Sequence, residues 1–352
     1  MKKGTKVGLY NPYLDTLGGG EKHILSIVDA VAEKGGEITV FWDKDLSREI
    51  KKRFSLRHIN KIKWLPRSLK TLRTLRTFNY FFYVTDGSYF FSPAKKNFVF
   101  CMVPDKKLYN LNLLNRLKLW NYKFISNSPY TTKWLTRWGI DPTTIPPHID
   151  TELFANAGNK KEKVILSVGR FFPHLHSKNQ EKIIETFEFL KLATPAFKDY
   201  KLILAGGLKN EDKIYFNQLK SKTKDSSIMF KPNIPLYELY KLYELSTYFW
   251  HFTGLGVDEE KHPERLEHFG IAPLEAIASG CLTFCHKSGG PKEIIKDGET
   301  GFLFGSEKDL MRKMKAVEKN SSLKDAVIIK GKNMVQKGYN YEVFKKRVLT
   351  IL

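Results

Sequence analysis

The chain has 352 residues, of which 42% are hydrophobic, and a formal net charge of +22. This length is enough for about two domains with a core each, and the hydrophobic share is typical of a globular protein. No segment reaches the ~18 apolar residues of a membrane-spanning helix. The first residues, 1–12, include lysines but no sustained apolar run, so we expect no secretory signal and a cytoplasmic chain.

Strand-like and helical segments alternate along the first half of the sequence. A short buried strand is expected at 6–10, then a loop with three glycines at 18–20, a helix from Glu21 to about Ala32 and a second strand at 37–42. The glycine loop does not match Gly-x-Gly-x-x-Gly, so no NAD site is predicted. Further strands are expected at 62–65, 80–84, 98–102 and 122–126, with helical stretches at 107–120 and 130–138.

A second alternating series follows a polar segment, residues 155–162, that reads as a linker. Its strands are expected near 164–168, 202–205, 227–230, 248–252, 282–285 and 301–304. Alternation of strands and helices is typical of a mostly parallel sheet covered on both faces. We therefore predict an α/β protein with two domains, an N-terminal one at 1–154 and a C-terminal one at 163–338.

Positive charge is concentrated in one acid-free stretch. Between Lys51 and Arg76 there are ten basic residues and no acidic one, interleaved with apolar residues. Such a stretch suits an anionic membrane, because each Lys or Arg near an acidic leaflet can add about 1 kcal/mol. A solvated basic face is the plainer alternative, and nucleic acid is a third, although no nucleic-acid motif accompanies the charge. The residues expected at a membrane or acceptor surface are Lys51, Lys52, Arg53, Lys61, Lys63 and Arg67.

The most informative stretch runs from residue 251 to 304. Glu267 lies in a loop, and an amphipathic helix starts near Gly270 and continues to about Ser279. The amides and dipole of a helix N-terminus attract anions, and Gly270 lets a diphosphate approach the backbone. Glu275 lies on the inward side of this helix, where a carboxylate needs a hydrogen-bonding partner such as a ribose diol. Either glutamate alone could be an ordinary surface or capping residue.

Two cations accompany these glutamates. Arg170 follows Gly169 after the strand at 164–168, and Lys178 precedes the next helix. Cations at the carboxyl end of a strand can hold a diphosphate and offset the charge that develops when its bond breaks. Either cation alone could be solvated, but together with the two glutamates they predict a diphosphate site. The spacing of acidic residues and histidines matches no established metal site, so no metal is expected.

Residues 267–275 resemble the signature of a known family. Glu267 and Glu275 enclose His-Phe-Gly, and Ser-Gly-Gly-Pro-Lys follows at 288–292. This pattern resembles the retaining glycosyltransferases of family 4, which have the GT-B fold, and is similar to the GDP-mannose-dependent mannosyltransferases that extend lipid-linked oligosaccharides. The resemblance implies two Rossmann-like domains facing each other across a cleft, and a C-terminal helix at 339–352 that crosses back to the N-terminal domain.

The resemblance also implies roles for individual residues. Glu267 would hold the donor sugar, while Arg170 and Lys178 would stabilise the departing diphosphate. Family members often carry a His where this chain has Met102, which puts a His-assisted step in doubt. The residues expected at the donor are Gly19, Gly20, Gly169, Gly270, Ile271, Ala272 and Glu275.

The function expected from the resemblance is retaining transfer of a hexose, with mannose from GDP-mannose favoured, to a hydroxyl of a lipid-linked or polysaccharide acceptor. No metal cofactor and no nucleic acid partner are expected, and the enzyme would be cytoplasmic and peripheral at the inner face of the membrane. Two alternatives remain open. One is a glycosyltransferase that uses a UDP-sugar, and the other is a non-catalytic module that binds a membrane surface.

Overall fold

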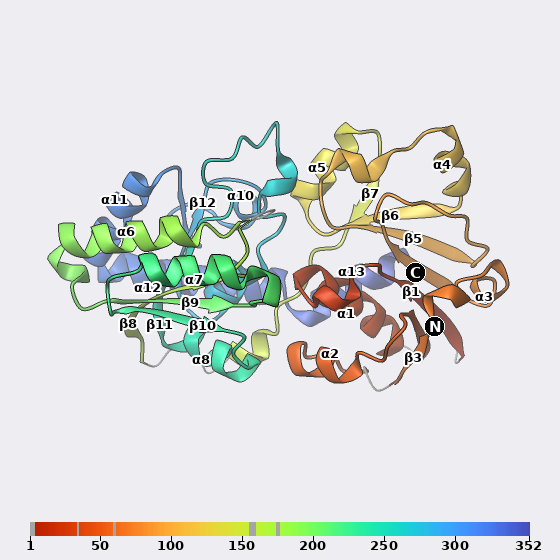
Figure 1. Ribbon diagram of the computed structural model, residues 1–352, viewed down its shortest axis with the longest axis horizontal. Helices are drawn as coiled ribbons and strands as arrows, with labels where there is room; N and C mark the ends of the chain where they lie inside the picture. The colour runs from red at the N-terminus through yellow and green to blue at the C-terminus, as the bar shows by residue number, and fades with distance from the viewer. Residues whose placement is uncertain (1–3, 34, 59–60, 155–159, 174–176) are drawn as a thin grey trace. The chain divides into compact units, whose positions relative to one another are not determined.

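The computed structural model describes residues 4–33, 35–58, 61–154, 160–173 and 177–352. The chain forms two compact units (Figure 1). Unit 1 comprises Met1–His148 and Tyr341–Leu352, and unit 2 comprises Ile149–Asn340. The predicted domain bounds of 154 and 163 stay a prediction, and most of the expected linker at 155–162 lies outside the described residues.

In the described residues, unit 1 contains one sheet of seven parallel strands in the order β3-β2-β1-β4-β5-β6-β7. Helices cover both of its faces, as expected for parallel strands joined by crossovers. The strands are β1 (Thr5–Tyr10), β2 (Gly36–Phe41), β3 (Ile62–Leu65), β4 (Tyr80–Val84), β5 (Lys96–Cys101), β6 (Tyr122–Ser126) and β7 (Pro142–Thr144). The helices are α1 (Gly19–Glu33), α2 (Ser47–Arg53), α3 (Leu72–Leu75), α4 (Leu113–Lys118), α5 (Pro129–Arg137) and α13 (Tyr341–Ile351).

The two faces of this sheet bury separate apolar clusters, because successive side chains of a strand point to opposite sides. In β4, Phe82 belongs to the cluster that includes residues of α1, α2 and α13. Its neighbour Phe81 belongs to the cluster on the other face, with Leu75 of α3 and Leu135 of α5. Helices α2 and α5 therefore cover opposite faces of the sheet.

Helix α13 belongs to unit 1 although it comes from the end of the chain. Its Phe344 and Val348 are buried in the same cluster as α1. At its start, the Tyr341 hydroxyl donates to Glu33 of α1 over 2.8 Å, and Lys345 Nζ lies 2.8 Å from the same carboxylate. The chain thus leaves unit 1 after His148 and returns at Tyr341.

Unit 2 has a second parallel sheet, with six strands in its described part and the order β10-β9-β8-β11-β12-β13. Two large apolar clusters lie on its two faces. The strands are β8 (Glu162–Val168), β9 (Lys201–Gly206), β10 (Ile228–Pro232), β11 (Ser246–His251), β12 (Leu282–His286) and β13 (Phe302–Phe304). The helices are α6 (Gln180–Ala193), α7 (Lys213–Lys222), α8 (Leu236–Leu245), α9 (Ile271–Ala278), α10 (Pro291–Ile294), α11 (Glu307–Glu318) and α12 (Ser321–Gly338).

The α/β class and the parallel sheets are confirmed, and each predicted strand is present with ends that differ by at most two residues. The single helix predicted at 107–120 is wrong. That segment forms a 3-10 turn at Lys106–Tyr109 and then α4, because Asn110 is extended and the Asn112 side chain caps a new helix by accepting from Asn115 N.

Candidate functional site

The candidate site lies where the strand order reverses in the sheet of unit 2, called sheet 2 from here on. From β8 the chain proceeds outward to β9 and β10, and then returns to β11 on the other side of β8. The helices after β8 and β11, α6 and α9, pack in different core clusters and so lie on opposite faces of the sheet. In open parallel sheets, the carboxyl ends of the two strands at such a reversal flank a ligand-binding crevice.

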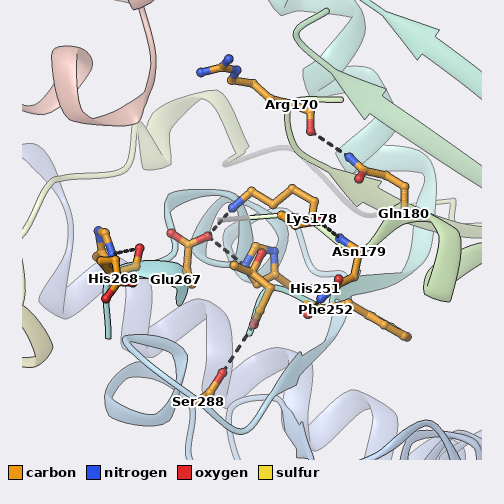
Figure 2. A network of polar contacts seen from close by, with 12 residues as sticks. Arg170, Lys178, Asn179, Gln180, His251, Phe252, Glu267, His268 and Ser288 are labelled. Carbon is orange, nitrogen blue, oxygen red and sulfur yellow. Dashed lines mark hydrogen bonds and ion pairs between the residues drawn. The ribbon is translucent and has the colours of Figure 1, made fainter. Parts of the chain in front are cut away.

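Lys178, His251 and Glu267 meet at this point (Figure 2). Lys178 Nζ lies 2.7 Å from Glu267 Oε2, and His251 Nε2 lies 2.9 Å from the same oxygen. The side chains of Lys178 and Glu267 are only 20% and 19% exposed, and that of His251 is 2% exposed. The structure therefore brings the predicted Lys178 and Glu267 into direct contact and adds a buried histidine.

The local structure around α6 fixes the direction of Lys178. Asn179 caps α6 in a left-handed conformation, with φ of 52°, and its side chain donates to Phe252 O over 2.8 Å. This bond ties the start of α6 to the end of β11, as Figure 2 shows. Gly169 leaves room for the Lys178 stem, since a Cβ at Gly169 would come within 2.4 Å of Lys178 Cγ.

The surroundings keep Glu267 ionised. Burial would raise the pKa of this carboxyl group, but the Lys178 charge and the hydrogen bond from His251 outweigh burial, so its pKa lies well below the ordinary value. Burial lowers the pKa of His251 against the opposing effect of Glu267, so the imidazole is neutral at pH 7. An ionised carboxylate only accepts hydrogen bonds, so His251 carries its proton on Nε2.

The loop that carries Glu267 is held by the glycines of the 288–292 motif. Gly290 N donates to Glu267 O over 2.7 Å. Gly289 has φ of 57°, and a Cβ there would come within 2.3 Å of Glu267 O. The motif thus serves to let two backbone segments approach each other, which places Glu267 beside Lys178.

Helix α9 begins directly after this loop, one residue later than predicted. Gly270 precedes it with φ of 111°, a conformation that suits glycine. The first N–H groups of a helix have no partner inside the helix, so the amides of Ile271 and Ala272 are of the kind that bind anions. Glu275, one turn further, accepts a hydrogen bond from the buried Tyr243 hydroxyl over 3.1 Å.

Arg170 lies at the same sheet edge but belongs to a different set of contacts. Its guanidinium is 3.8 Å from Asp212 Oδ2 and packs over the Phe172 ring at 4.7 Å. Its carbonyl accepts a hydrogen bond from the Gln180 side chain over 2.8 Å, as drawn in Figure 2. Its expected part in stabilising a diphosphate stays a prediction.

The glycines predicted at the donor in unit 1 lie at the start of α1. The helix begins at Gly19, two residues earlier than predicted, so Gly19 and Gly20 form its first turn. The reason is Glu21, whose carboxylate accepts from Gly18 N at 2.8 Å and from the Thr16 hydroxyl at 2.6 Å, as in a capping box. Gly20 faces Met102, whose sulfur would lie 2.3 Å from a Cβ at that position.

The predicted basic surface is exposed in unit 1. Three of its residues end α2, and the other three lie on or beside β3. Arg67 pairs with Asp43, and its guanidinium covers Trp42 at 4.7 Å. The members are Lys51, Lys52, Arg53, Lys61, Lys63 and Arg67. Their expected contact with a membrane or acceptor stays a prediction.

The described residues form neither a metal cluster nor a membrane-spanning helix. No group of three or more His, Cys, Asp or Glu side chains is placed to hold a metal ion in the described ranges. Over the same ranges, every helix is too short or too polar to cross a bilayer.

Sequence reasoning assigned no role to two residues of the site. His251 ends β11, and a histidine at the carboxyl end of a buried strand beside a reversal of strand order was a usable signal. Tyr243 lies in α8, distant in sequence from Glu275, and nothing in its spacing indicates the contact.

Solved structures of glycosyltransferases share this fold along nearly the whole chain. HepE from Anabaena, solved in complex with UDP and glucose, matches with a TM-score of 0.74 at 13% identity over 99% of each chain. WaaG, a glycosyltransferase involved in lipopolysaccharide biosynthesis, matches with a TM-score of 0.64 at 15% identity over 99% of each chain. At such identities the likeness establishes the fold alone, which is GT-B.

Sequence relatives match about half of the chain. The human GDP-Man:Man(3)GlcNAc(2)-PP-Dol alpha-1,2-mannosyltransferase is 33% identical over 202 residues, 52% of this chain and 38% of that protein. The Xenopus tropicalis protein of the same name is 36% identical over 171 residues, 46% and 32% of the two chains. The matches thus span about a third of the length of these relatives. The pattern of the family described as "Glycosyl transferases group 1" matches residues 148–334, more than half of the chain. The chain therefore belongs to the group 1 glycosyl transferases.

Proposed function

We propose that the protein transfers mannose from GDP-mannose to a hydroxyl group of a lipid-linked acceptor, with retention of configuration and without a metal ion. The observation that carries the proposal is the Lys178–Glu267 contact at the strand-order reversal of sheet 2, beside the amino end of α9. Support for the donor and the acceptor class comes from the names of the relatives, which match about half of the chain.

Each residue of the site has a separate task in this proposal. The Lys178 ammonium has three N–H donors, and one goes to Glu267, so the others can bind the departing diphosphate. Lys178 and His251 both contact Oε2 of Glu267, so Oε1 can accept a hydroxyl of the donor sugar. Glu275 binds the ribose, and Tyr243 orients its carboxylate.

In this proposal the leaving diphosphate takes up the negative charge that develops in the reaction and accepts the proton of the acceptor. The amides at the start of α9 and the Lys178 charge stabilise the negative charge that develops on it. No side-chain nucleophile is assigned. Glu267 is held ionised by Lys178 and His251, which suits hydroxyl binding and makes it a poor general acid. The proton of the acceptor hydroxyl then passes to the leaving phosphate.

A panel of nucleotide sugars tests the proposal. Purified protein is mixed with GDP-mannose, GDP-glucose, UDP-glucose or UDP-N-acetylglucosamine, and both the melting temperature and nucleotide release with a lipid-linked acceptor are measured. We expect GDP-mannose to raise the melting temperature most, because a ligand bound to the native state stabilises it according to its affinity. If a UDP-sugar raised the melting temperature more than GDP-mannose did, the UDP-sugar would become the assigned donor. If no donor changed the melting temperature or released nucleotide, the non-catalytic alternative would be favoured.

Glu275→Gln gives the matched test of the site itself. The variant loses the charge that binds the ribose and should weaken binding of GDP as well as of GDP-mannose. Glu299→Gln, in a turn of the same unit, is the control and should leave both affinities unchanged. Equal affinities in all three proteins would remove the assigned role of Glu275.

A further inference from the structure

Large apolar side chains are exposed on and just after the short helix α4. Leu113, Leu114 and Leu117 are 75%, 68% and 61% exposed, and Trp120 in the turn that follows is 73% exposed. Figure 1 shows α4 at the outer margin of unit 1, beyond the strands. Single exposed apolar residues are ordinary, but a contiguous group of this kind marks a surface that contacts another body.

The order of residues around α4 gives this surface an amphipathic pattern. At 3.6 residues per turn, the three leucines fall within about 100° of arc, with Arg116 about 60° to one side and Lys118 about 40° to the other. On the inward side, Asn115 donates to Asn110 O over 2.7 Å and Leu119 is buried. The outward face is therefore apolar at its centre and basic at both margins.

The sequence on both sides of α4 has charges of one sign. Between Asp105 and Asp141 the sequence has no acidic residue and seven basic ones, namely Lys106, Lys107, Arg116, Lys118, Lys123, Lys133 and Arg137. Arg116 Nε donates to Leu111 O over 2.9 Å, which holds its guanidinium beside the leucines. A protein partner could supply an apolar groove, but an apolar centre with a basic margin on both sides complements a bilayer with anionic headgroups.

This surface is distinct from the basic stretch predicted from the sequence. Leu119 packs in the cluster on the sheet face that α5 covers. Ile50 of α2, the helix that ends in Lys51, Lys52 and Arg53, packs in the cluster on the opposite face. The α4 surface and the α2 end of the basic stretch therefore lie on opposite faces of the same sheet.

We propose that Leu113, Leu114, Leu117 and Trp120 insert into an anionic lipid bilayer and dock unit 1 on it, with Arg116 and Lys118 at the headgroups. Trp is enriched at the boundary between headgroups and acyl chains, and basic side chains extend toward phosphates while their stems stay in the apolar layer. Such a surface would bring the protein to the bilayer that contains a lipid-linked acceptor.

Vesicle flotation tests the proposal without any donor or acceptor, so its outcome is independent of the proposed reaction. The full chain is floated with vesicles of phosphatidylcholine alone and of phosphatidylcholine with phosphatidylglycerol. The test variant is Leu114→Asp with Leu117→Asp. The matched control is Leu192→Asp with Ile214→Asp, which replaces two apolar residues of unit 2 that are at least as exposed as the two leucines. All four positions are exposed, so the substitutions should leave the fold intact. The melting temperature of each variant checks this and should equal that of the wild type.

We expect the wild type and the control to bind the anionic vesicles, and the α4 variant to bind at least about tenfold more weakly. Blue-shifted fluorescence of Trp120 in anionic vesicles, lost in Trp120→Phe, would support insertion. Equal flotation of the α4 variant and the wild type would overturn the proposal and favour the α2 stretch.

If the wild type bound neutral and anionic vesicles equally, the proposal that anionic lipid is the partner would be overturned. Self-association of the wild type in lipid-free buffer, abolished in the α4 variant together with no vesicle binding, would assign the surface to a second copy.

Discussion

Replacement of Lys178 by Met tests the central contact of the site in the absence of any ligand. The change keeps the aliphatic stem that lies over Gly169 and removes the charge that lies 2.7 Å from Glu267. Glu267 then keeps one neutral donor, His251, and stays largely buried. We expect unit 2 to become less stable, because a carboxylate that has lost its counter-ion is costly to bury.

The size of this loss in unfolding free energy follows from how deeply Lys178 and Glu267 are buried. Removal of one partner costs about 3 to 5 kcal/mol in a fully buried pair and about 0.2 to 1 kcal/mol in an exposed one. Lys178 and Glu267 are 20% and 19% exposed, which is nearer the buried case. We therefore expect Lys178→Met to cost about 2 to 3 kcal/mol. Lys178→Met with Glu267→Gln should cost less than the sum of the single changes, by about 1 to 2 kcal/mol.

The loss of stability in Lys178→Met should also become smaller as pH falls. The depressed pKa of Glu267 stabilises the wild type above the pKa of an unfolded glutamate, and this stabilisation is lost as pH falls toward the folded value. In Lys178→Met, burial is no longer offset by the lysine, so the pKa of Glu267 rises. The difference in stability between the two proteins should therefore shrink as pH falls from about 6 to about 4.

Trp250 makes the measurement specific to unit 2. It is the single tryptophan between residues 149 and 340, while the other five belong to unit 1. It is fully buried in β11, next to His251. Urea unfolding of protein labelled with 5-fluorotryptophan, followed through the Trp250 fluorine resonance, separates the two units.

Lys182→Met in α6 is the matched control. Lys182 lies 2.8 Å from Glu185, but both side chains are more than half exposed, so no measurable change is expected. If Lys178→Met were as stable as the control, or if its effect simply added to that of Glu267→Gln, the Lys178–Glu267 contact would not exist in solution and the reasoning would be refuted.

Three further predictions concern other features. Gly289→Ala should destabilise unit 2 by more than Gly298→Ala, because both positions have positive φ but only at Gly289 would the Cβ collide with Glu267 O, and comparison of their urea midpoints checks this. His23→Phe should make the stability of unit 1 depend less on pH. Burial lowers the pKa of His23 to about 3, so the wild type should lose about 2 kcal/mol of unfolding free energy between pH 7 and pH 5, because the unfolded chain binds a proton there and the folded chain does not. An equal pH dependence of the urea midpoint in both proteins would contradict this. Tyr243→Phe should weaken GDP binding by about three- to tenfold, measured by calorimetry, because Glu275 loses a donor; unchanged affinity would contradict the orienting role of Tyr243.

The sequence predicts the strands, and it predicts that Lys178 and Glu267 belong to one site, although not that they touch each other. Strands buried on both faces are continuous apolar runs, such as 80–84 and 202–205, and these are visible without a structure. Lys178 and Glu267 each follow a strand of the same parallel sheet, and the carboxyl ends of such strands share one edge. Their place at one edge of the sheet follows from the topology, whereas their direct contact is shown by the structure.

Two kinds of feature could not be predicted from the sequence. One is set by contacts between distant segments, and the other is which face of a helix is buried. The run Leu-Asn-Leu-Leu-Asn-Arg-Leu-Lys-Leu at 111–119 has a pattern that fits a core helix, but only Leu119 of this run is buried. Periodicity identifies a helix with an apolar face and does not say whether that face turns inward. Likewise, the left-handed Gly289 reflects the approach of the Glu267 loop, which is 22 residues away in sequence.

The return of the chain to unit 1 has a consequence for synthesis on the ribosome. The apolar side of α1 is completed by Phe344, Val348 and Ile351, which are made after every residue of unit 2. As the nascent chain emerges, unit 2 can complete its own core before α13 is made, whereas the part of unit 1 that precedes residue 149 keeps an apolar surface exposed until then. Chaperone binding during translation should therefore be strongest at the part of unit 1 that precedes residue 149, and it should persist until α13 has left the exit tunnel.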